Sequence, residues 1–265
     1  MRIPIAITLI VALSSCSPIP MIALSDDDWR PTSEMPVKGR SGFFIRQKLA
    51  FGEYRTGPVA RSWAKGSNWR AEGSFPNDWL DRIAVEWVRR KQTVRFALTD
   101  DQGRISQVTA LARVQWRDLQ IGGNPTSLTN IMGGMLRVGD EANDTYAVRI
   151  FTDRQEEPWE MLIDNYATRR YAKSYIGLLA RNSNEYYTVV PVYKLRNPRG
   201  EAVDLPFGGS LGFEFKNREG KILAAVSLIG NGAVYLGECS DEEKFLLANA
   251  SAALLLQQLL DEGVR

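Results

Sequence analysis

The 265-residue sequence contains no histidine. This absence removes the usual general base of enzymes, every histidine metal ligand and the Ser-His-Asp triad. Two cysteines are too few for a structural zinc site. No phosphate-binding or dinucleotide-binding glycine motif lies between a strand pattern and a helix pattern. The sequence therefore indicates no cofactor and no metal, and it favours a protein that is not an enzyme.

The two cysteines, Cys16 and Cys239, are far apart in the chain. Cys239 precedes a predicted helix, whose N-terminus can lower the pKa of a thiol and make it reactive. A nucleophilic or redox pair would need a histidine or a further cysteine beside it. We therefore interpret Cys239 as a small, buried apolar side chain.

The N-terminus carries targeting features. Arg2 precedes an apolar stretch, residues 3–13, that is too short for a transmembrane helix. The sequence LSSC that ends at Cys16 resembles the lipobox of bacterial lipoproteins. The resemblance implies that residues 1–15 are a lipoprotein signal peptide and that Cys16 becomes the first mature residue, carrying acyl chains such as palmitate. An ordinary secretory signal with an unrelated cysteine is the alternative.

The same resemblance implies a location. Ser17 follows the modified cysteine, where an aspartate would retain a lipoprotein at the inner membrane. Two or more acyl chains anchor a protein stably. We therefore expect a lipid-anchored protein of the bacterial cell envelope, on the periplasmic side of the outer membrane. Residues 16–40 are predicted to be a flexible tether, and residues 41–265 a single β-rich domain.

The clearest secondary-structure signal is a C-terminal helix over residues 241–262. Ser240 and Glu243 have the spacing of a capping box, and Gly263 is suited to end the helix. The helix is apolar nearly all round, which indicates burial on every side. Its apolar run falls short of the ~20 residues that a bilayer requires. The rest of the domain must therefore enclose this helix.

The residues before the helix have the pattern of β-strands. Residues 43–51 alternate in polarity, and later strand-like runs are separated by turns at residues 100–103, 181–185, 217–220 and 230–232. Residues 77–91 fit either a helix or a strand, and we favour a strand. The expected fold is mainly β: an antiparallel barrel or strongly curved sheet around the buried hydrophobic C-terminal helix.

Two short motifs lie near the ends of this region: FFIRQK at residues 43–48 and EGKILAAV at residues 219–226. The second is followed by a strand, an acidic turn and the hydrophobic helix. This order resembles the tubby C-terminal-like domains, the group that includes phospholipid scramblases and plant LURP-one-related proteins. The resemblance implies a twelve-stranded barrel threaded by the helix and, by analogy, binding of phosphorylated lipid or a scaffold role near a membrane. Residues 52–210 match only in being rich in strands.

Basic residues concentrate in residues 38–117, which hold sixteen Lys and Arg against seven Asp and Glu. Such residues, interleaved with aromatic ones, stack on sugars or enter a lipid headgroup layer. The alternative is that the tryptophans pack in the core and the charges face solvent. Nucleic acid is not an expected partner. The candidate binding residues are Arg61, Trp63, Lys65, Trp69 and Arg70.

Ser62 and Lys65 have the S-x-x-K spacing of penicillin-binding enzymes, in which the lysine lies one helical turn from a nucleophilic serine. The other motifs of that class are absent, and Gly57 and Gly66 disfavour a helix here. A chance match is the preferred interpretation. Acidic groups at residues 26–28, 140–144 and 156–157 lack calcium-loop spacing.

Together these patterns predict a membrane-anchored envelope lipoprotein. Its domain is expected to be non-enzymatic, to bind an anionic lipid, a glycan or an envelope protein, or to act as a scaffold. Two alternatives stay open: a cell-envelope serine hydrolase that uses Ser62 and Lys65, and a structural subunit of an envelope assembly.

Overall fold

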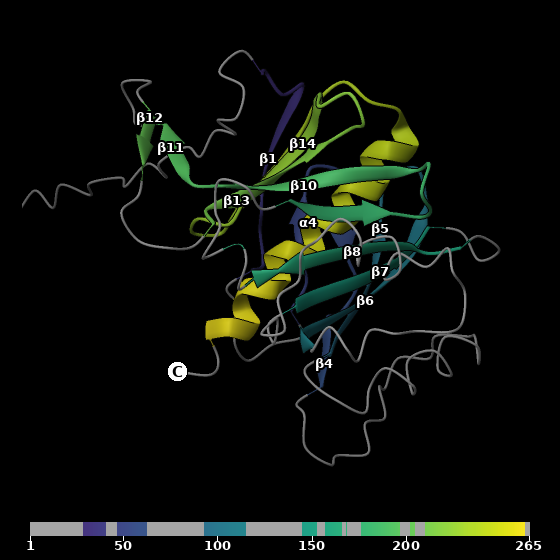
Figure 1. Cartoon of the computed structure of the whole chain (residues 1–265). Coiled ribbons are helices and arrows are strands. Elements are labelled where there is room, and N and C mark those ends of the chain that lie inside the picture. The colour runs from purple at the N-terminus through teal and green to yellow at the C-terminus, as the bar shows by residue number, and fades with distance from the viewer. Residues whose placement is uncertain are drawn as a thin grey trace, which may run out of the picture.

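A curved antiparallel sheet wraps around a C-terminal helix (Figure 1). The computed structural model describes residues 29–40, 47–62, 93–114, 145–152, 157–165, 168, 176–196, 202–204 and 210–262. Within these residues the fold is mainly β, and the sheet is nearly closed, like a barrel. The predicted fold class is confirmed.

Alternating side chains account for the strands. In β5, for example, Val94, Phe96 and Leu98 are buried, while Arg95 and Ala97 between them are partly exposed. The described elements are β1 (Ser33–Pro36), β2 (Ala50–Phe51), β3 (Tyr54–Thr56), β4 (Ala60–Ser62), β5 (Thr93–Thr99), β6 (Ile105–Val114), β7 (Thr145–Phe151), β8 (Trp159–Asp164), β9 (Gly177–Ala180), β10 (Tyr186–Val192), β11 (Lys194–Arg196), β12 (Ala202–Asp204), β13 (Gly212–Lys216), β14 (Ile222–Ser227), β15 (Ala233–Leu236) and α4 (Asp241–Glu262).

The sheet closes through its two edge strands. The strand order is β1-β15-β14-β13-β10-β9-β8-β7-β6-β5-β3-β2, with β4 pairing with β5 as well. Just beyond β1, the amide of Lys38 donates to the carbonyl of Ala50 (2.8 Å), and the amide of Ala50 donates back (3.1 Å). A barrel of eight strands holds only side chains. This longer path is wide enough to hold a helix.

The helix α4 supplies the centre of the core. Residues 245–256 are buried on all sides, as the sequence predicts. Four of them, Ala248, Ala250, Ala252 and Ala253, expose none of their surface. Small side chains at these positions let the surrounding strands approach the helix closely.

The start of α4 has the predicted capping box. The amide of Ser240 donates to Glu243 Oε2 (2.9 Å), and the amide of Glu243 donates to Ser240 Oγ (3.2 Å). Each side chain thus satisfies a main-chain amide that has no partner within the helix. The boundaries of α4 agree with the prediction of residues 241–262.

The predicted hairpins are also present. Residues 181–185 join β9 to β10, residues 217–220 join β13 to β14, and the turn at Gly230 and Gly232 joins β14 to β15. In these turns Gly220, Gly230 and Gly232 have positive φ, the region that glycine adopts most easily. These short turns therefore make strands that follow one another in the sequence pair side by side in the sheet.

The predicted tether, residues 16–40, is wrong over its last part. Ser33–Pro36 form β1, which pairs with β15, and Met35 and Val37 are buried in the core. The segment is short and contains Pro36, which lacks an amide donor and therefore hides a strand signal. The ordered domain begins before residue 41.

Other predicted features lie outside the described residues. These are the signal peptide and lipobox at residues 1–16, the FFIR part of the first motif, and the ambiguous segment 77–91. No helix among the described residues is long and apolar enough to cross a membrane.

Two glycines test how tightly α4 is enclosed. Gly232 and Gly220 both have positive φ, but a Cβ on Gly232 would lie 2.4 Å from Leu255 Cδ2 and 2.9 Å from the carbonyl oxygen of Ser227. A Cβ on Gly220 would meet nothing within 4 Å.

We expect Gly220→Ala to lower the free energy of unfolding by about 1 kcal/mol through backbone strain alone. Gly232→Ala is expected to cost about 1–3 kcal/mol more, because the Leu255 side chain of α4 and the carbonyl of Ser227 must both give way. Chemical denaturation of both variants measures the difference. Equal losses would show that the helix is not held against this turn.

Candidate functional site

The two ends of the sheet differ in their connections. We call the end where α4 begins the capped end, and the opposite end the loop end. Connections in an antiparallel sheet alternate between its two ends. At the capped end the joins are tight turns, such as residues 100–104, 181–185 and 217–220. At the loop end three joins are long, residues 63–92 between β4 and β5, 115–144 between β6 and β7, and 193–211 between β10 and β13, whereas residues 228–232 make a tight turn.

Long connections on a rigid scaffold are where binding residues concentrate. The hairpin of β11 and β12 belongs to one of them and stands apart from the main sheet (Figure 1). The candidate binding stretch predicted from the sequence also begins at this end, since Arg61 lies in β4 just before residues 63–92. The loop end is therefore the place to look for a site.

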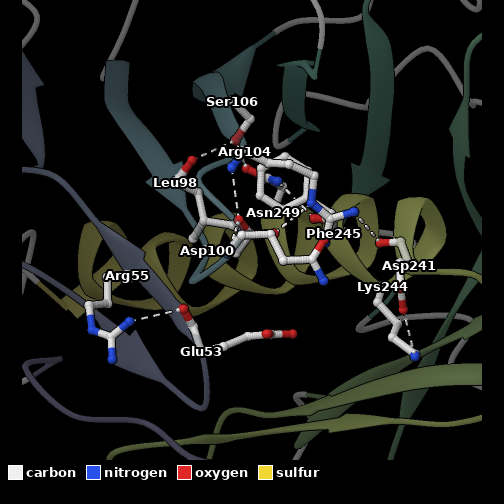
Figure 2. Close-up of polar contacts among 11 residues, drawn as sticks. Glu53, Arg55, Leu98, Asp100, Arg104, Ser106, Asp241, Lys244, Phe245 and Asn249 are labelled. Atoms are coloured by element: carbon white, nitrogen blue, oxygen red, sulfur yellow. Dashed lines mark hydrogen bonds and ion pairs between the residues drawn. The ribbon is translucent and has the colours of Figure 1, made fainter.

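The capped end is occupied by an internal network (Figure 2). The buried carboxylate of Asp100 accepts hydrogen bonds from the amides of Gln102 (3.1 Å) and Arg104 (2.9 Å) and from Arg104 Nε (2.6 Å). Arg104 Nη1 donates to the carbonyl of Asp241 (2.9 Å), and its guanidinium lies 4.8 Å from the ring centre of Phe245. The network fastens the β5–β6 turn to the start of α4.

The pKa of Asp100 reflects these contacts. Burial alone would raise it, but the hydrogen bonds and charge of Arg104, with the amide of Gln102, outweigh burial and hold the pKa below its ordinary value. The carboxylate is therefore charged at neutral pH and paired within the protein.

Deeper in the barrel, a second polar pair links α4 to β6. The hydroxyl of Ser106 donates to Asn249 Oδ1, and Asn249 Nδ2 donates to the carbonyl of Phe245 (2.8 Å). Both side chains are fully buried. A buried amide is tolerated only when it is hydrogen-bonded, so this pair fixes the rotation of α4 inside the sheet.

Cys239 lies half-buried beside the start of α4. Burial raises the pKa of its thiol to about 11, and the nearby carboxylate of Glu243 adds to the shift. These effects exceed any lowering by the helix N-terminus. The thiol is protonated at neutral pH, which agrees with an inert side chain and not with a nucleophile.

The loop end contains a chain of contacts between two arginines. Arg61 lies opposite Val94, whose side chain is in the core, so Arg61 is on the inner face of the sheet. Arg61 Nη2 donates to Gln47 Oε1 (2.6 Å), and Gln47 Nε2 donates to the carbonyl of Arg40 (2.7 Å). The buried Gln47 side chain thereby holds the guanidinium of Arg61 in place.

Arg40 ties the loop end to the helix. Its guanidinium donates to the carbonyls of Leu255 (3.2 Å), Leu228 (2.9 Å) and Gly230 (3.0 Å). Tyr146 adds a hydrogen bond from its hydroxyl to the carbonyl of Ala253 (2.7 Å). Arg40 and Tyr146 thus reach carbonyls in the C-terminal half of α4, at Leu255 and Ala253, and Arg40 also bonds two carbonyls of the β14–β15 turn.

Arg61 has a different environment. Burial lowers the pKa of Arg61 from its ordinary value, and Tyr146 opposes the shift slightly. An arginine starts so high that it stays protonated at neutral pH. Among the described residues, its side chain bonds only the neutral amide of Gln47. This charge is therefore partly desolvated without an acidic partner.

Of the other predicted site residues, the structure describes only Ser62. Ser62 is the last residue of β4 and pairs with Thr93, so its backbone is extended, whereas the S-x-x-K motif requires a helix. The remaining candidates lie outside the described residues, so the pairing of Ser62 with Lys65 is untested: Cys16, Trp63, Lys65, Trp69 and Arg70.

Two residues of this site were missed by sequence reasoning. Gln47 belongs to the alternating stretch at residues 43–51, where it shares a face with Leu49 and Phe51. A polar residue at such a position is the sequence signal for a polar partner inside the barrel. Arg40 was assigned to the tether. In the part of the chain that the structure describes, no three Cys, Asp or Glu residues group closely enough to hold a metal ion.

Comparison of the chain with protein-family models, with curated proteins and with solved structures finds no match. The assignment of function therefore depends on the geometry of the two ends and on the sequence motifs. At the loop end, Arg61 is a partly buried guanidinium that is paired with no acidic side chain among the described residues.

The network at the capped end should make the stability of the protein depend on pH. Because the pKa of Asp100 is lowered on folding, its contribution to stability is present above the unfolded pKa, about 3.9, and is lost as the pH falls through the folded value. We expect Asp100→Asn to lower the free energy of unfolding at pH 7 by about 1.5–3 kcal/mol. The variant should also lose less stability than the parent below about pH 4.

The matched control is Asp101→Asn. Asp101 is exposed and pairs with the exposed Arg55, so its loss should cost under about 1 kcal/mol. Denaturation curves between pH 7 and pH 2 measure both variants. If Asp100→Asn kept the full acid sensitivity of the parent, the burial and pairing of Asp100 would not contribute to stability.

Proposed function

We propose that this protein is a lipid-anchored lipoprotein of the bacterial cell envelope, held on the periplasmic side of the outer membrane through Cys16. Its β domain is proposed to be a non-enzymatic module that binds a lipid, glycan or protein partner. The proposed binding role is supported by the difference between the two ends of the domain. The chain enters at the capped end, and the long connections with Arg61 lie at the loop end.

The contacts of Trp29 and Thr32 show at which end of the sheet the described chain begins. Thr32 donates from its amide to the carbonyl of Leu236 (2.8 Å), next to the start of α4. Trp29 packs on the outer face of the sheet against Ala225 and Tyr235. Residues 29–32 are thus fixed at the capped end.

The revised start of the domain also shortens the tether. Ser33, the first residue of β1, is 33 − 16 = 17 positions after Cys16. At ~3.4 Å per residue a fully extended chain of this length spans about 60 Å. The domain would remain near the membrane, and its loop end would face away from the anchor in the simplest arrangement.

The resemblance to tubby C-terminal-like domains supports a binding role in the same way. The closed path of strands around a C-terminal helix agrees with the architecture that the resemblance implies. Fold alone does not fix function, so the proposal depends on the lipobox for the anchor and on the loop end for binding.

The anchor is tested by fractionation of cells that express the full chain. We expect Cys16→Ala to move the protein from the membrane to the soluble fraction, because the thiol that accepts the lipid is lost. Cys239→Ala is the matched control, since it removes the other cysteine and should leave the protein in the membrane. Membrane retention of Cys16→Ala would refute the lipid anchor.

A further inference from the structure

Arg61 is a partly buried charge that the fold does not explain. Moving a charged group out of water is costly unless it is paired. Two other arginines, one at each end of the sheet, have structural acceptors. Arg104 at the capped end bonds Asp100, and Arg40 at the loop end bonds three carbonyls. Arg61 bonds one neutral amide oxygen.

The guanidinium of Arg61 retains capacity for a ligand. An arginine side chain has five N–H donors in a planar fork, and Gln47 accepts from one nitrogen, Nη2. Gln47 is itself only 8% exposed and fixed by Arg40. The fork is therefore held in place before a ligand arrives, which lowers the entropy lost on binding.

We propose that Arg61 receives an oxyanion, a phosphate or carboxylate group of the ligand, at the loop end of the barrel. A guanidinium fork matches the two oxygens of such a group, and the partly desolvated setting strengthens the attraction. The oxyanion site rests on the proposed binding function; the choice between a soluble and a membrane source of the oxyanion also uses the proposed lipid anchor.

The position of Arg61 favours a soluble source of this group. Residues 29–32 lie at the capped end, so a short tether from Cys16 would turn that end toward the anchoring bilayer. Arg61 lies at the opposite end, beside the contacts of Arg40 and Tyr146 with the C-terminal half of α4. The competing explanation is that Arg61 serves only to complement the carbonyl end of the helix.

The test is a titration of the full chain in detergent micelles with sodium phosphate and with sodium acetate, at ionic strength held constant with chloride. Calorimetry and the change in Tm report binding. We expect phosphate or acetate to bind the parent, and Arg61→Gln to weaken the affinity at least tenfold. Arg55→Gln is the matched control, because Arg55 is an exposed arginine at the capped end, and it should bind like the parent.

Arg61→Lys keeps the charge and loses the fork. It provides a second variant if Arg61→Gln fails to fold, and a loss of affinity with unchanged Tm is expected. Parent-like affinity in the folded Arg61 variants would overturn the proposal and leave Arg61 as a helix-end charge. Absence of Arg61-dependent binding to phosphate, to acetate and to anionic vesicles would overturn it as well.

Vesicles distinguish the sources of the oxyanion. The Cys16→Ala chain is mixed with phosphatidylglycerol vesicles and, as a control, with phosphatidylcholine vesicles. Arg61-dependent binding of free phosphate without vesicle binding supports a soluble ligand, whereas Arg61-dependent binding to the anionic vesicles alone indicates a headgroup. If neither phosphate nor acetate bound, the proposed lipid anchor would be unaffected. If Cys16→Ala stayed in the membrane, the proposed anion site would be unaffected.

Discussion

The structure depends on one constraint: α4 is apolar on every side and must be enclosed. A helix of this kind has no face for water, so the strands have to pass all round it. The sheet meets this requirement with a long antiparallel path that closes at Lys38 and Ala50. The alanines of α4 allow the close approach, and the Ser106–Asn249 pair fixes which side of the helix faces β6.

Enclosing a helix gives the domain two unlike ends. At the capped end, Arg104 joins Asp100 to the start of α4, and the capping box satisfies main-chain amides of the helix. At the loop end, long connections leave the sheet and Arg61 keeps its charge beside a neutral amide. A lipid anchor that joins at the capped end would leave the loop end accessible. Attachment and binding would then be separate functions of opposite ends.

The local parts of this structure could be predicted from the sequence, and the long-range parts could not. The capping box of Ser240 and Glu243, the glycine turns and the alternation in β5 are each encoded within a few residues. The role of β1 depends on β15, some two hundred residues later, and Pro36 weakens its local signal. Arg61 was chosen for its basic, aromatic surroundings. Its inward direction follows from the pairing of β4 with β5, which no local pattern reveals.

The enclosure of α4 is tested most directly by native-state hydrogen exchange of its main-chain amides. If the sheet closes around the helix, the amides of residues 246–256 can exchange only when the barrel opens, so their exchange free energies should equal the global free energy of unfolding. Amides of β5, β6 and β7 should exchange in the same group. Exchange of the helix amides at much lower free energy, while these strands stay protected, would contradict the account.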